Sequence, residues 1–583
     1  MLKRLAKSVR EYKKASLLSP VLVSLEVLME VLIPTFMAKL VDYGIDKGDM
    51  SYIVKMGIIL AVLAFVSLMF GALAGKYAAY ASAGFAKNLR KDMYYKVQQY
   101  SFSNIDKFST ASIVTRLTTD VTNLQNAYQM LIRVAVRSPI MFLFAFIMSF
   151  KTSAKLASII LCCVPVLVVG LYLVIRFAHP IFERVFKTYD KLNCVVQENL
   201  RGMRVVKSFV REDHETGKFQ NISTEIYRDF SKAEKILAFN APLMQLCTYT
   251  CMILISWIGS RMIVSSGNNP AVGFTTGQLM SFMTYLMQIL MSLMMLSMVF
   301  VTMTISRASA ERIVEILEEE SDITNPENPV TTVADGSIQY QNVNFSYSKD
   351  KNKLCLKHIN VSIEAGQTVG IIGGTASSKS SLVQLIPRLY DVTEGEVLVG
   401  GVDVRNYDLE TLRNEVAMVL QKNVLFSGTI KENLRWGNEN ASDEEIEHAC
   451  KLAQADSCIQ TFPDKYNTYI EQGGSNVSGG QKQRLCIARA LLKKPKILVM
   501  DDSTSAVDTK TDALIREAML HEIPDTTKII IAQRISSVQD ADLILVMENG
   551  EICGSGTHEE LLKSNEIYKE VYESQVKGAE ENE

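Results

Sequence analysis

The chain has 583 residues, 48% of them hydrophobic, and a formal net charge of −2. This length predicts two or three domains, and the near-zero charge argues against a nucleic-acid-binding protein. None of the ten cysteines has CxxC or Cys/His spacing, which argues against a disulfide framework and a zinc site. Long apolar runs fill the first half, whereas the second half has the pattern of a soluble α/β domain.

Six apolar segments of the first half are long enough to cross a bilayer, which takes about 20 helical residues. They are Leu17–Leu40, Ile53–Ala79, Val134–Phe150, Ala154–Phe177, Leu237–Val264 and Gln278–Val301. Lys and Arg gather in the two long loops after the second and fourth segments, so the positive-inside rule places these loops and the N-terminus in the cytoplasm. The basic N-terminus merges into a full-length span, so we expect no cleavable signal peptide. Residues 1–320 are therefore predicted to form a helical bundle in the lipid bilayer.

The two long loops have the pattern of amphipathic helices that continue from the spans. Such helices would project well beyond the bilayer and reach a domain lying away from it. The tip of the first loop is Asn104–Thr110, and the second loop contains the stretch Glu198–Glu212. A plain solvated helical hairpin is the alternative interpretation.

Two patterns inside the spans are unusual. Glu26 and Glu30 lie one turn apart on one face of the first span, and an ionisable group at membrane depth usually faces a cavity or a partner. Contact with a cationic substrate, pairing with a basic residue and a place near the interface all remain open. Methionines recur every three or four residues in the last span, at Met280, Met283, Met287, Met291, Met294 and Met298. Helix packing is the favoured explanation, and contact with a drug-like ligand is the alternative.

A linker is predicted at residues 321–335. A charged helical stretch follows the last span, and Asn325-Pro326 and Asn328-Pro329 then interrupt it, because a residue before proline resists helical geometry. The soluble domain is predicted to span residues 336–583, beginning with the alternating apolar residues of a strand pair.

A phosphate-binding loop is predicted in this soluble domain. A strand-like run, Thr368–Ile372, precedes the loop, and a helical stretch, Ser381–Arg388, follows it. This is the strand–loop–helix context that a P-loop requires. In such a loop Lys379 meets the β- and γ-phosphates of ATP and Ser380 holds Mg²⁺. The loop consists of Gly373, Gly374, Thr375, Ala376, Ser377, Ser378, Lys379 and Ser380.

A second phosphate-binding element lies downstream. The small-residue turn Val477–Gln481 leads into a predicted helix, Gln483–Lys493, whose start offers backbone N–H groups and a positive dipole end to an anion. The apolar run Ile497–Met500 is predicted as a buried strand that ends on Asp501 and Asp502. Asp501 would hold the same Mg²⁺ as Ser380.

Together these motifs resemble the nucleotide-binding domain of an ATP-binding cassette (ABC) transporter. With the six spans, the resemblance covers nearly the whole chain, and it is to exporters that fuse spans and ATPase in one half-transporter. It implies a helical membrane bundle joined to an α/β P-loop cassette, with coupling helices at the loop tip Asn104–Thr110 and after Glu198–Glu212. It also implies that Tyr347 stacks on adenine, the alternative being a tyrosine on a strand surface. Tyr466–Gly474 resembles the exporter-specific loop before the signature.

The same resemblance implies further site residues. Gln421 would bond Mg²⁺ or the attacking water and touch the coupling helices. The remaining nucleotide contacts implied are Ser381, Asp508 and the signature residues Ser478, Gly479, Gly480 and Gln481.

The chain departs from the family pattern in its catalytic residues. Asp502 stands where the family has the glutamate that polarises water, and it is shorter by one methylene. Gln533 replaces the switch histidine; it can donate a hydrogen bond to a γ-phosphate but carries no proton at neutral pH. Ala376 and Ser378 replace two glycines of the P-loop, where any special backbone angle becomes costlier.

The signature, by contrast, is nearly regular. In this family each ATP lies between the P-loop of one subunit and the signature of the other. We therefore expect a heterodimer, in which a second half-transporter supplies the missing Glu and His and this chain lends its signature. The expected protein is a multi-pass exporter of a bacterial plasma membrane with its ATPase in the cytoplasm, hydrolysing ATP slowly at its own site.

The cargo is expected to be drugs or other amphiphilic compounds. A lipid or peptide exporter and an ATP-gated regulator with a non-hydrolysing site are the alternatives. An importer of siderophores or metals would need an added binding domain, and a DNA-repair ATPase is excluded by the six spans.

Overall fold

The computed structural model describes residues 1–270, 272–502 and 507–580. The chain forms two compact units, and each is described by itself. The membrane unit comprises Met1–Gln98 and Thr110–Glu319, and the cassette unit comprises Gln99–Ser109 and Glu320–Glu583.

Within the described residues, the membrane unit contains six helical segments long and apolar enough to cross a membrane. This confirms the six predicted spans. The segments are Leu2–Ile45, Met50–Gln98, Thr110–Thr152, Ala154–Arg201, Glu212–Ser266 and Thr276–Glu318. Helix α3 (Met50–Gln98) has 49 residues, about 70 Å at 1.5 Å per residue, more than twice the bilayer core. The predicted extension of the helices beyond the bilayer is therefore confirmed.

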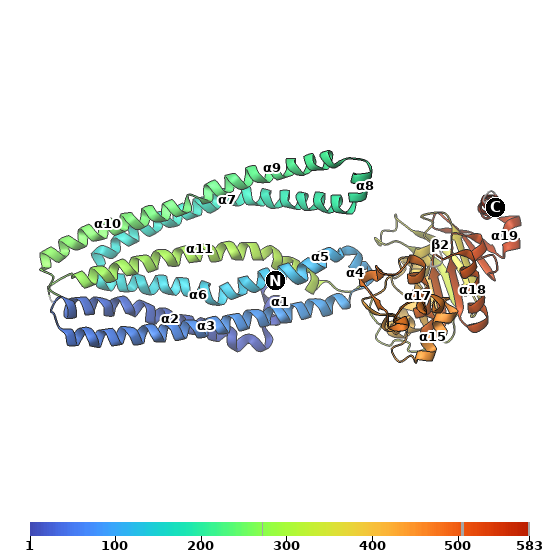
Figure 1. Cartoon of the computed structure of the whole chain (residues 1–583), viewed down its shortest axis with the longest axis horizontal. Coiled ribbons are helices and arrows are strands. Elements are labelled where there is room, and N and C mark those ends of the chain that lie inside the picture. The colour runs from blue at the N-terminus through green and yellow to red at the C-terminus, as the bar shows by residue number, and fades with distance from the viewer. Residues whose placement is uncertain (271, 503–506, 581–583) are drawn as a thin grey trace. The chain divides into compact units, whose positions relative to one another are not determined.

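Four helices of the membrane unit lie side by side: α2 (Lys13–Leu40), α3, α6 (Val121–Thr152) and α11 (Thr276–Glu318). Helix α7 (Ala154–Arg201) pairs with α9 (Glu212–Leu237) and α10 (Asn240–Ser266), and this hairpin carries the short helix α8 (Met203–Ser208) at its tip (Figure 1). The shorter helical segments are α1 (Leu2–Ala6), η1 (Lys7–Tyr12), η2 (Val41–Ile45), α5 (Thr110–Thr115) and η3 (Arg116–Asp120).

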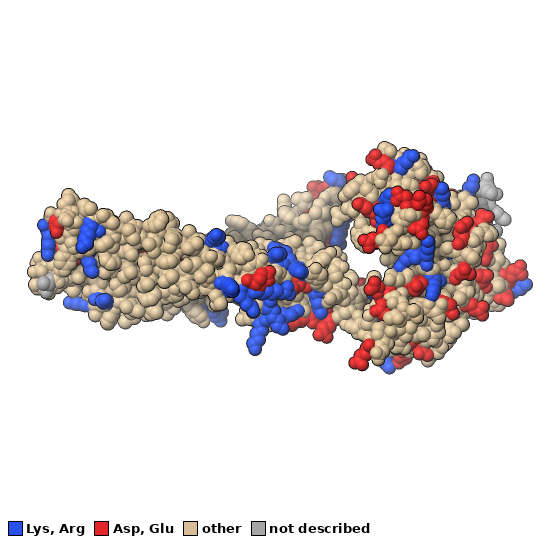
Figure 2. Space-filling view, turned by 90° about the horizontal axis from the view of Figure 1, so that it is seen from below, with Lys and Arg blue, Asp and Glu red and all other residues tan. Residues whose placement is uncertain are grey.

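Charge is distributed unevenly over the membrane unit. Figure 2 shows a band of this unit with few charged side chains on the viewed face, bordered on one side by a dense group of Lys and Arg. The exposed basic residues of the N-terminal segment and of α3 include Lys3, Lys7, Lys13, Lys14 and Lys87. This is the distribution that the positive-inside rule expects at a cytoplasmic border.

The two glutamates of the first span pair with a basic residue, one of the three possibilities left open. Arg137, on α6, donates to both carboxylate oxygens of Glu30 at 2.8 and 2.7 Å and also to Oε1 of Glu26. The side chain of Glu26 is 9% exposed and packs against bare backbone of α3, since a Cβ added at Gly71 would lie 2.8 Å from Glu26 Oε1. The pair thus joins three of the four central helices.

The methionine pattern has a different outcome. Met283 packs against the apolar core of the membrane unit, but Met280, Met287, Met291, Met294 and Met298 are exposed. Packing inside this chain therefore explains Met283 but not the five exposed methionines. Their side chains are available to lipid, ligand or a second subunit.

The cassette unit is built on a six-stranded sheet in the order β12-β11-β3-β10-β9-β6. Its strands pair in parallel except for β12, which is antiparallel to β11. A four-stranded sheet, β2-β1-β4-β5, and a two-stranded sheet, β7-β8, complete the unit. The strands are β1 (Ile338–Phe345), β2 (Leu356–Ile363), β3 (Thr368–Gly373), β4 (Glu394–Val399), β5 (Val402–Asp403), β6 (Val416–Val419), β7 (Gly428–Thr429), β8 (Tyr469–Ile470), β9 (Ile497–Asp501), β10 (Thr527–Ile531), β11 (Leu543–Glu548) and β12 (Glu551–Gly556).

Both faces of the parallel sheet are covered. Ile497 and Val499 of β9 join one apolar cluster, and Leu498 and Met500 join the other, which explains why this strand is apolar throughout. The α-helices of the unit are α4 (Phe102–Lys107), α12 (Lys379–Gln384), α13 (Leu409–Glu415), α14 (Ile430–Leu434), α15 (Asp443–Leu452), α16 (Asp456–Ile459), α17 (Gly479–Leu492), α18 (Thr509–Glu522), α19 (His558–Ser564) and α20 (Glu566–Glu580). Short 3-10 helices are η4 (Val404–Asn406), η5 (Lys465–Asn467), η6 (Gln472–Gly474) and η7 (Ile535–Ser537).

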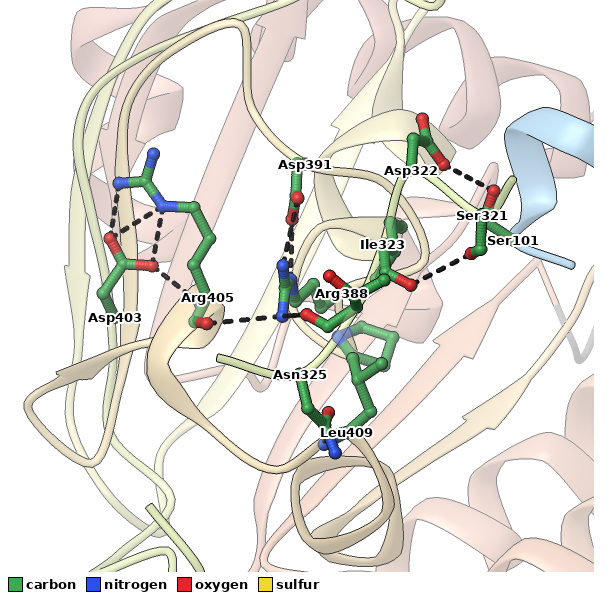
Figure 3. A network of polar contacts seen from close by, with 12 residues as sticks. Ser101, Ser321, Asp322, Ile323, Asn325, Arg388, Asp391, Asp403, Arg405 and Leu409 are labelled. Atoms are coloured by element: carbon green, nitrogen blue, oxygen red, sulfur yellow. Dashed lines mark hydrogen bonds and ion pairs between the residues drawn. The ribbon is translucent and has the colours of Figure 1, made fainter. Parts of the chain in front are cut away.

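The segment that precedes β1 is fastened to the cassette unit (Figure 3). Arg388, which is buried, donates to the carbonyl oxygen of Thr324 at 3.2 Å and forms two hydrogen bonds with Asp391 at 2.8 and 3.2 Å. Asn325 accepts a hydrogen bond from the Leu409 amide at 3.0 Å. These hydrogen bonds tie Thr324 and Asn325, which are both exposed, to the cassette unit.

Asp322 of the same segment binds α4, the tip of the first long loop. Its carboxylate accepts hydrogen bonds from Ser101 at 2.5 Å, Ser103 at 2.7 Å and Lys349 at 2.8 Å. Burial acts to raise the pKa of Asp322, but the hydrogen bonds from Lys349 and the two serines lower it to about 2. Ser101 also caps α4 through a capping box with Asn104. Helix α4 therefore belongs to the cassette unit by its contacts.

Candidate functional site

The predicted site residues converge at one edge of the parallel sheet. The P-loop follows β3, Asp501 ends β9 and Asp502 follows it, Gln533 follows β10, and Gln421 follows β6. These four strands are parallel neighbours, with Ile531 in register with both Ile371 and Asp501, so their carboxyl ends share one edge. In an open α/β sheet this edge is where ligands bind.

The side chain of Lys379 forms hydrogen bonds with residues of its own loop. Its Nζ donates to the carbonyl oxygens of Gly373 and Gly374, at 2.8 Å each, and to Ser377 Oγ at 3.1 Å. Burial lowers the pKa of Lys379, while the charges of Asp502 and Asp501 act against that shift. A Cβ added at Gly373 would lie 2.2 Å from the Met547 carbonyl oxygen, so this position requires glycine.

The two substituted glycine positions adopt left-handed backbone angles. Ala376 has φ of 64° and Ser378 has φ of 66°, in the region that glycine adopts without a steric penalty. The prediction of a costly backbone at these positions is confirmed. Ser378 is the N-cap residue of α12, and its side chain makes no capping hydrogen bond there.

Ser380 and Asp501 bring two oxygens together at the base of the loop. Ser380 Oγ donates to Asp501 Oδ1 at 3.0 Å, which matches the separation of adjacent ligands on a magnesium octahedron, about 3.0 Å for bonds of about 2.1 Å. Burial raises the pKa of Asp501, and the nearby charge of Asp502 raises it further, while Ser380 and Lys379 oppose the shift. A cation beside this buried carboxylate would favour its charged form, so the residues fit Mg²⁺.

Asp502 is held by two glutamine amides. Its Oδ2 accepts from Gln533 Nε2 at 2.8 Å and from Gln421 Nε2 at 3.4 Å. Its backbone has φ of 48°, and its amide donates to the Ile531 carbonyl oxygen at 3.0 Å. Gln483, on α17, donates to the Asp502 carbonyl oxygen at 3.4 Å. The structure thus brings all three predicted catalytic residues, Asp502, Gln533 and Gln421, into contact.

Tyr347 lies just beyond β1 and is 45% exposed. Its hydroxyl lies 2.9 Å from Ser381 Oγ, beside α12 rather than on the surface of the strand. The ring packs edge to face on Tyr390 at 5.0 Å, and Tyr390 donates to Asp106 of α4 at 2.6 Å. Tyr347 and Ser381, both predicted nucleotide contacts, therefore lie together beside the P-loop helix.

The signature residues form the start of α17. Ser478 is its N-cap residue and forms a capping box with Gln481. The backbone amide of Gln481 donates to Ser478 Oγ at 3.3 Å. Ser478 and Gly479 are exposed, so the first turn of this helix presents its amide groups outward. The helix begins at Gly479, four residues before the predicted start.

Other boundaries differ in smaller ways. Helix α12 runs from Lys379 to Gln384 rather than from Ser381 to Arg388, because Pro387 lacks an amide proton and Arg388 has a positive φ of 49°. Asp508 caps α18, accepting from the Thr511 amide at 2.9 Å. The four residues that separate Asp502 from Val507 lie outside the described residues.

The sequence-based prediction did not include the contacts of Gln483 with Asp502, of Tyr390 with Tyr347, or of Asp322 with α4. Gln483 lies within the signature helix, but its i+2 spacing from Gln481 gives no signal, because residues two apart on a helix do not share a face. For Tyr390 and Asp322 the sequence carries no signal, because both contacts depend on tertiary packing.

Comparison with known proteins decides the family. Residues 16–308 match the family model of the ABC transporter transmembrane region. Residues 356–505 match a second family model, described as "ABC transporter". The chain belongs to the ABC transporter family. It carries both parts of a half-transporter, so ATPase activity is the activity of the family.

Similar ABC transporters come from several bacteria. An uncharacterised ABC transporter ATP-binding protein of Bacillus subtilis, YfiB, is 36% identical over 567 residues, which is 97% of each chain. A second, MT1311 of Mycobacterium tuberculosis, is 35% identical over 580 residues, 99% of this chain and 98% of the relative. The ATP-dependent lipid A-core flippase of Desulfotalea psychrophila is 30% identical over 493 residues, 84% of each chain.

The fold has a solved counterpart. A bacterial Atm1-family ABC exporter with ATP bound superposes with a TM-score of 0.83, covering 97% of this chain and 99% of that one, at 24% identity. The fold class predicted from the sequence is therefore confirmed. It is a six-span helical bundle fused to an α/β ATP-binding cassette.

Proposed function

We propose that this chain is the slow-site half of a heterodimeric, ATP-driven exporter. The observation that carries the proposal is the geometry of Asp502, whose Oδ2 is occupied by Gln533 at 2.8 Å and by Gln421 at 3.4 Å. An oxygen that already accepts two amide hydrogens is a poor base for an attacking water. The side chain is also one methylene shorter than the family glutamate, and a misplacement of about 1 Å can cost roughly 10²-fold in rate.

Nucleotide binding remains intact in this proposal. Lys379 would meet the phosphates of ATP, and Ser380 and Asp501 would hold Mg²⁺, which neutralises phosphate charge when bound. Gln533 would sense the γ-phosphate as a hydrogen-bond donor, without the proton transfer that a histidine allows. The site therefore holds ATP and turns it over slowly.

The signature of this chain would serve the partner's site. Ser478 and Gly479 are exposed at the start of α17, where the helix dipole and unbonded amides favour a phosphate. The second half-transporter would supply a regular P-loop, glutamate and histidine opposite them. Fast hydrolysis would then occur at that composite site.

Exposed apolar surfaces on both units support a partner of the same architecture. Around α8, Val205, Phe209 and Val210 are 59%, 72% and 81% exposed. On the cassette unit, Phe426 and Trp436 stack at 4.2 Å with 45% and 65% of their surface exposed. Apolar patches of this kind mark interaction sites, and a second half-transporter offers matching surfaces.

The cargo proposed is an amphiphilic compound, either drug-like or lipid-like, moved out of the cytoplasm across a bacterial plasma membrane. Five exposed methionines of α11 offer adaptable apolar contacts. The 30% identical relative that is named as a lipid flippase favours a lipid-like molecule as the second candidate. Reconstitution in proteoliposomes, with a fluorescent lipid and a fluorescent drug as alternative cargoes, distinguishes the two.

The test of the asymmetric pair uses two variants of this chain. In the complex with its partner half-transporter, Asp502→Asn should leave ATP turnover nearly unchanged, whereas Ser478→Arg should remove most of it. Ser555→Arg, at an exposed serine of edge strand β12, controls for the added charge. Loss of turnover in Asp502→Asn together with full turnover in Ser478→Arg would reject the proposal.

A further inference from the structure

A glutamine near the C-terminus contacts the backbone around the switch residue. Gln575, on α20, donates from Nε2 to the carbonyl oxygen of Gln533 at 2.8 Å. Its Oε1 accepts from the Ile535 amide at 2.9 Å. One side-chain amide thus bonds the main chain on both sides of Arg534, immediately after the residue that touches Asp502.

The switch segment, residues 532–535, leaves the sheet at this point. The Ala532 amide still donates to the Ile371 carbonyl oxygen at 3.3 Å, which places it in the strand ladder. Beyond it, Gln533 and Arg534 are exposed, and the chain returns to the core at Ile535, which is 1% exposed. The two bonds from Gln575 span this exposed turn.

Helix α20 is anchored well enough to serve as a fixed support. Tyr568 is fully buried, its hydroxyl lies 2.8 Å from His558 Nδ1 and its amide donates to Asn565 Oδ1 at 2.9 Å. Val571 and Tyr572 pack on the apolar cluster that also contains Ile535. The helix and the end of the switch segment therefore share one core.

We propose that Gln575 is a positioning residue that sets where the Gln533 side chain can reach. A primary amide is the side-chain group that offers both a donor and an acceptor in a fixed plane, and both are used on this turn. Without them the exposed turn loses two fixed points, and the Gln533 amide samples positions away from Asp502 and from the γ-phosphate. This inference rests on the proposed function, because it takes Gln533 as the γ-phosphate sensor.

The expected effect is a loss of discrimination between ATP and ADP. Gln533 would contact only the γ-phosphate, so Gln575→Ala should weaken ATP binding by about three- to tenfold, the range for one hydrogen bond, and leave ADP binding unchanged. Gln575→Glu should behave similarly, because it keeps the acceptor for Ile535 but places a carboxylate against the Gln533 carbonyl. A purely structural role would weaken both nucleotides together.

The experiment is a competition titration of ATP and ADP against a fluorescent nucleotide, with the full chain in lipid nanodiscs. Each variant is described by the ratio of its affinity for ATP to its affinity for ADP. Gln533→Ala gives the reference ratio, and the double variant of Gln533 and Gln575 tests whether the two effects add. Glu570→Ala, at an exposed residue of α20, is the matched control. The ratio in the Gln575 variants should fall toward that of Gln533→Ala, and the double variant should fall no further.

The two ideas fail in different ways. A lowered ratio in Gln533→Ala with a wild-type ratio in both Gln575 variants would overturn the positioning role alone. An unchanged ratio in Gln533→Ala would overturn the sensor role of Gln533 and the positioning role with it.

Discussion

Restoring the P-loop glycines should stabilise the cassette unit without tightening its hold on ATP. Ala376 and Ser378 have φ of 64° and 66°, a region that costs a non-glycine residue about 1–2 kcal/mol. Glycine at each position would remove this cost, but its greater backbone freedom in the unfolded chain offsets about 0.5–1 kcal/mol of the gain in stability. The double variant Ala376→Gly/Ser378→Gly should therefore gain about 1–2 kcal/mol, or roughly 2–8 °C in melting temperature for a domain of this size.

The affinity for ATP should stay the same because glycine keeps the backbone N–H groups with which the loop would contact the phosphates. Ser378 makes no capping hydrogen bond that glycine would lose. Fluorescence of Trp436 during heating reports the unfolding of the cassette unit, and a titration with a fluorescent ATP analogue reports affinity.

The neighbouring glycines provide matched controls. A Cβ added at Gly374 meets nothing within 4 Å, so Gly374→Ala should be neutral, whereas Gly373→Ala places a Cβ 2.2 Å from the Met547 carbonyl oxygen and should destabilise the unit. An unchanged melting temperature in the double glycine variant, with ATP affinity several-fold higher, would refute the reasoning. It would mean that the loop adopts these angles only when nucleotide binds.

Three further predictions concern charged groups. Arg137→Leu leaves Glu26 buried without a partner and should lower the free energy of unfolding by up to about 3 kcal/mol. This is the low end for a broken buried ion pair, because the guanidinium is 32% exposed. Thermal unfolding measures the loss, and an effect no larger than that of Arg133→Leu would contradict the prediction. Asp322 has its pKa lowered to about 2, so its stabilisation is present above about pH 3.8 and is lost as the pH falls toward 2. The difference in melting temperature between wild type and Asp322→Asn should thus be constant near neutrality and shrink below about pH 4. A difference that persists in full at pH 2 would contradict the lowered pKa of Asp322. Lys379→Ala should lower ATP affinity by at least about tenfold, since it removes a charge-assisted contact to phosphate; equilibrium titration with ATP tests this, and wild-type affinity would show that the loop does not bind the phosphates.

Much of the site could be predicted because its residues follow local patterns. Asp501 ends a short apolar strand, Gln421 and Gln533 each lie two residues beyond one, and Lys379 ends the loop that follows another. Parallel strands deliver their carboxyl ends to one edge. The start of α17 was misplaced although the signal was present. Ser478 followed three residues later by Gln481 is the pattern of a capping box, and it marks the helix start.

The contacts that escaped prediction join residues far apart in the chain. Arg137 lies 107 and 111 residues from Glu30 and Glu26, and Gln575 lies 42 residues from Gln533. No periodicity or spacing connects such pairs, because their proximity results from how helices pack. The left-handed angles at Ala376 and Ser378, in contrast, were anticipated from the glycines that the family pattern has at these two positions.

Slow hydrolysis at Asp502 is the central property proposed for this chain. The direct measurement is the ATP turnover of the wild-type chain purified alone in lipid nanodiscs, with Asp502→Ala as the background. We expect turnover close to that background and a rise of about tenfold or more when Asp502→Glu and Gln533→His are combined, given the roughly 10²-fold cost of a misplaced group. Brisk turnover by the wild-type chain that Asp502→Ala abolishes would contradict the account.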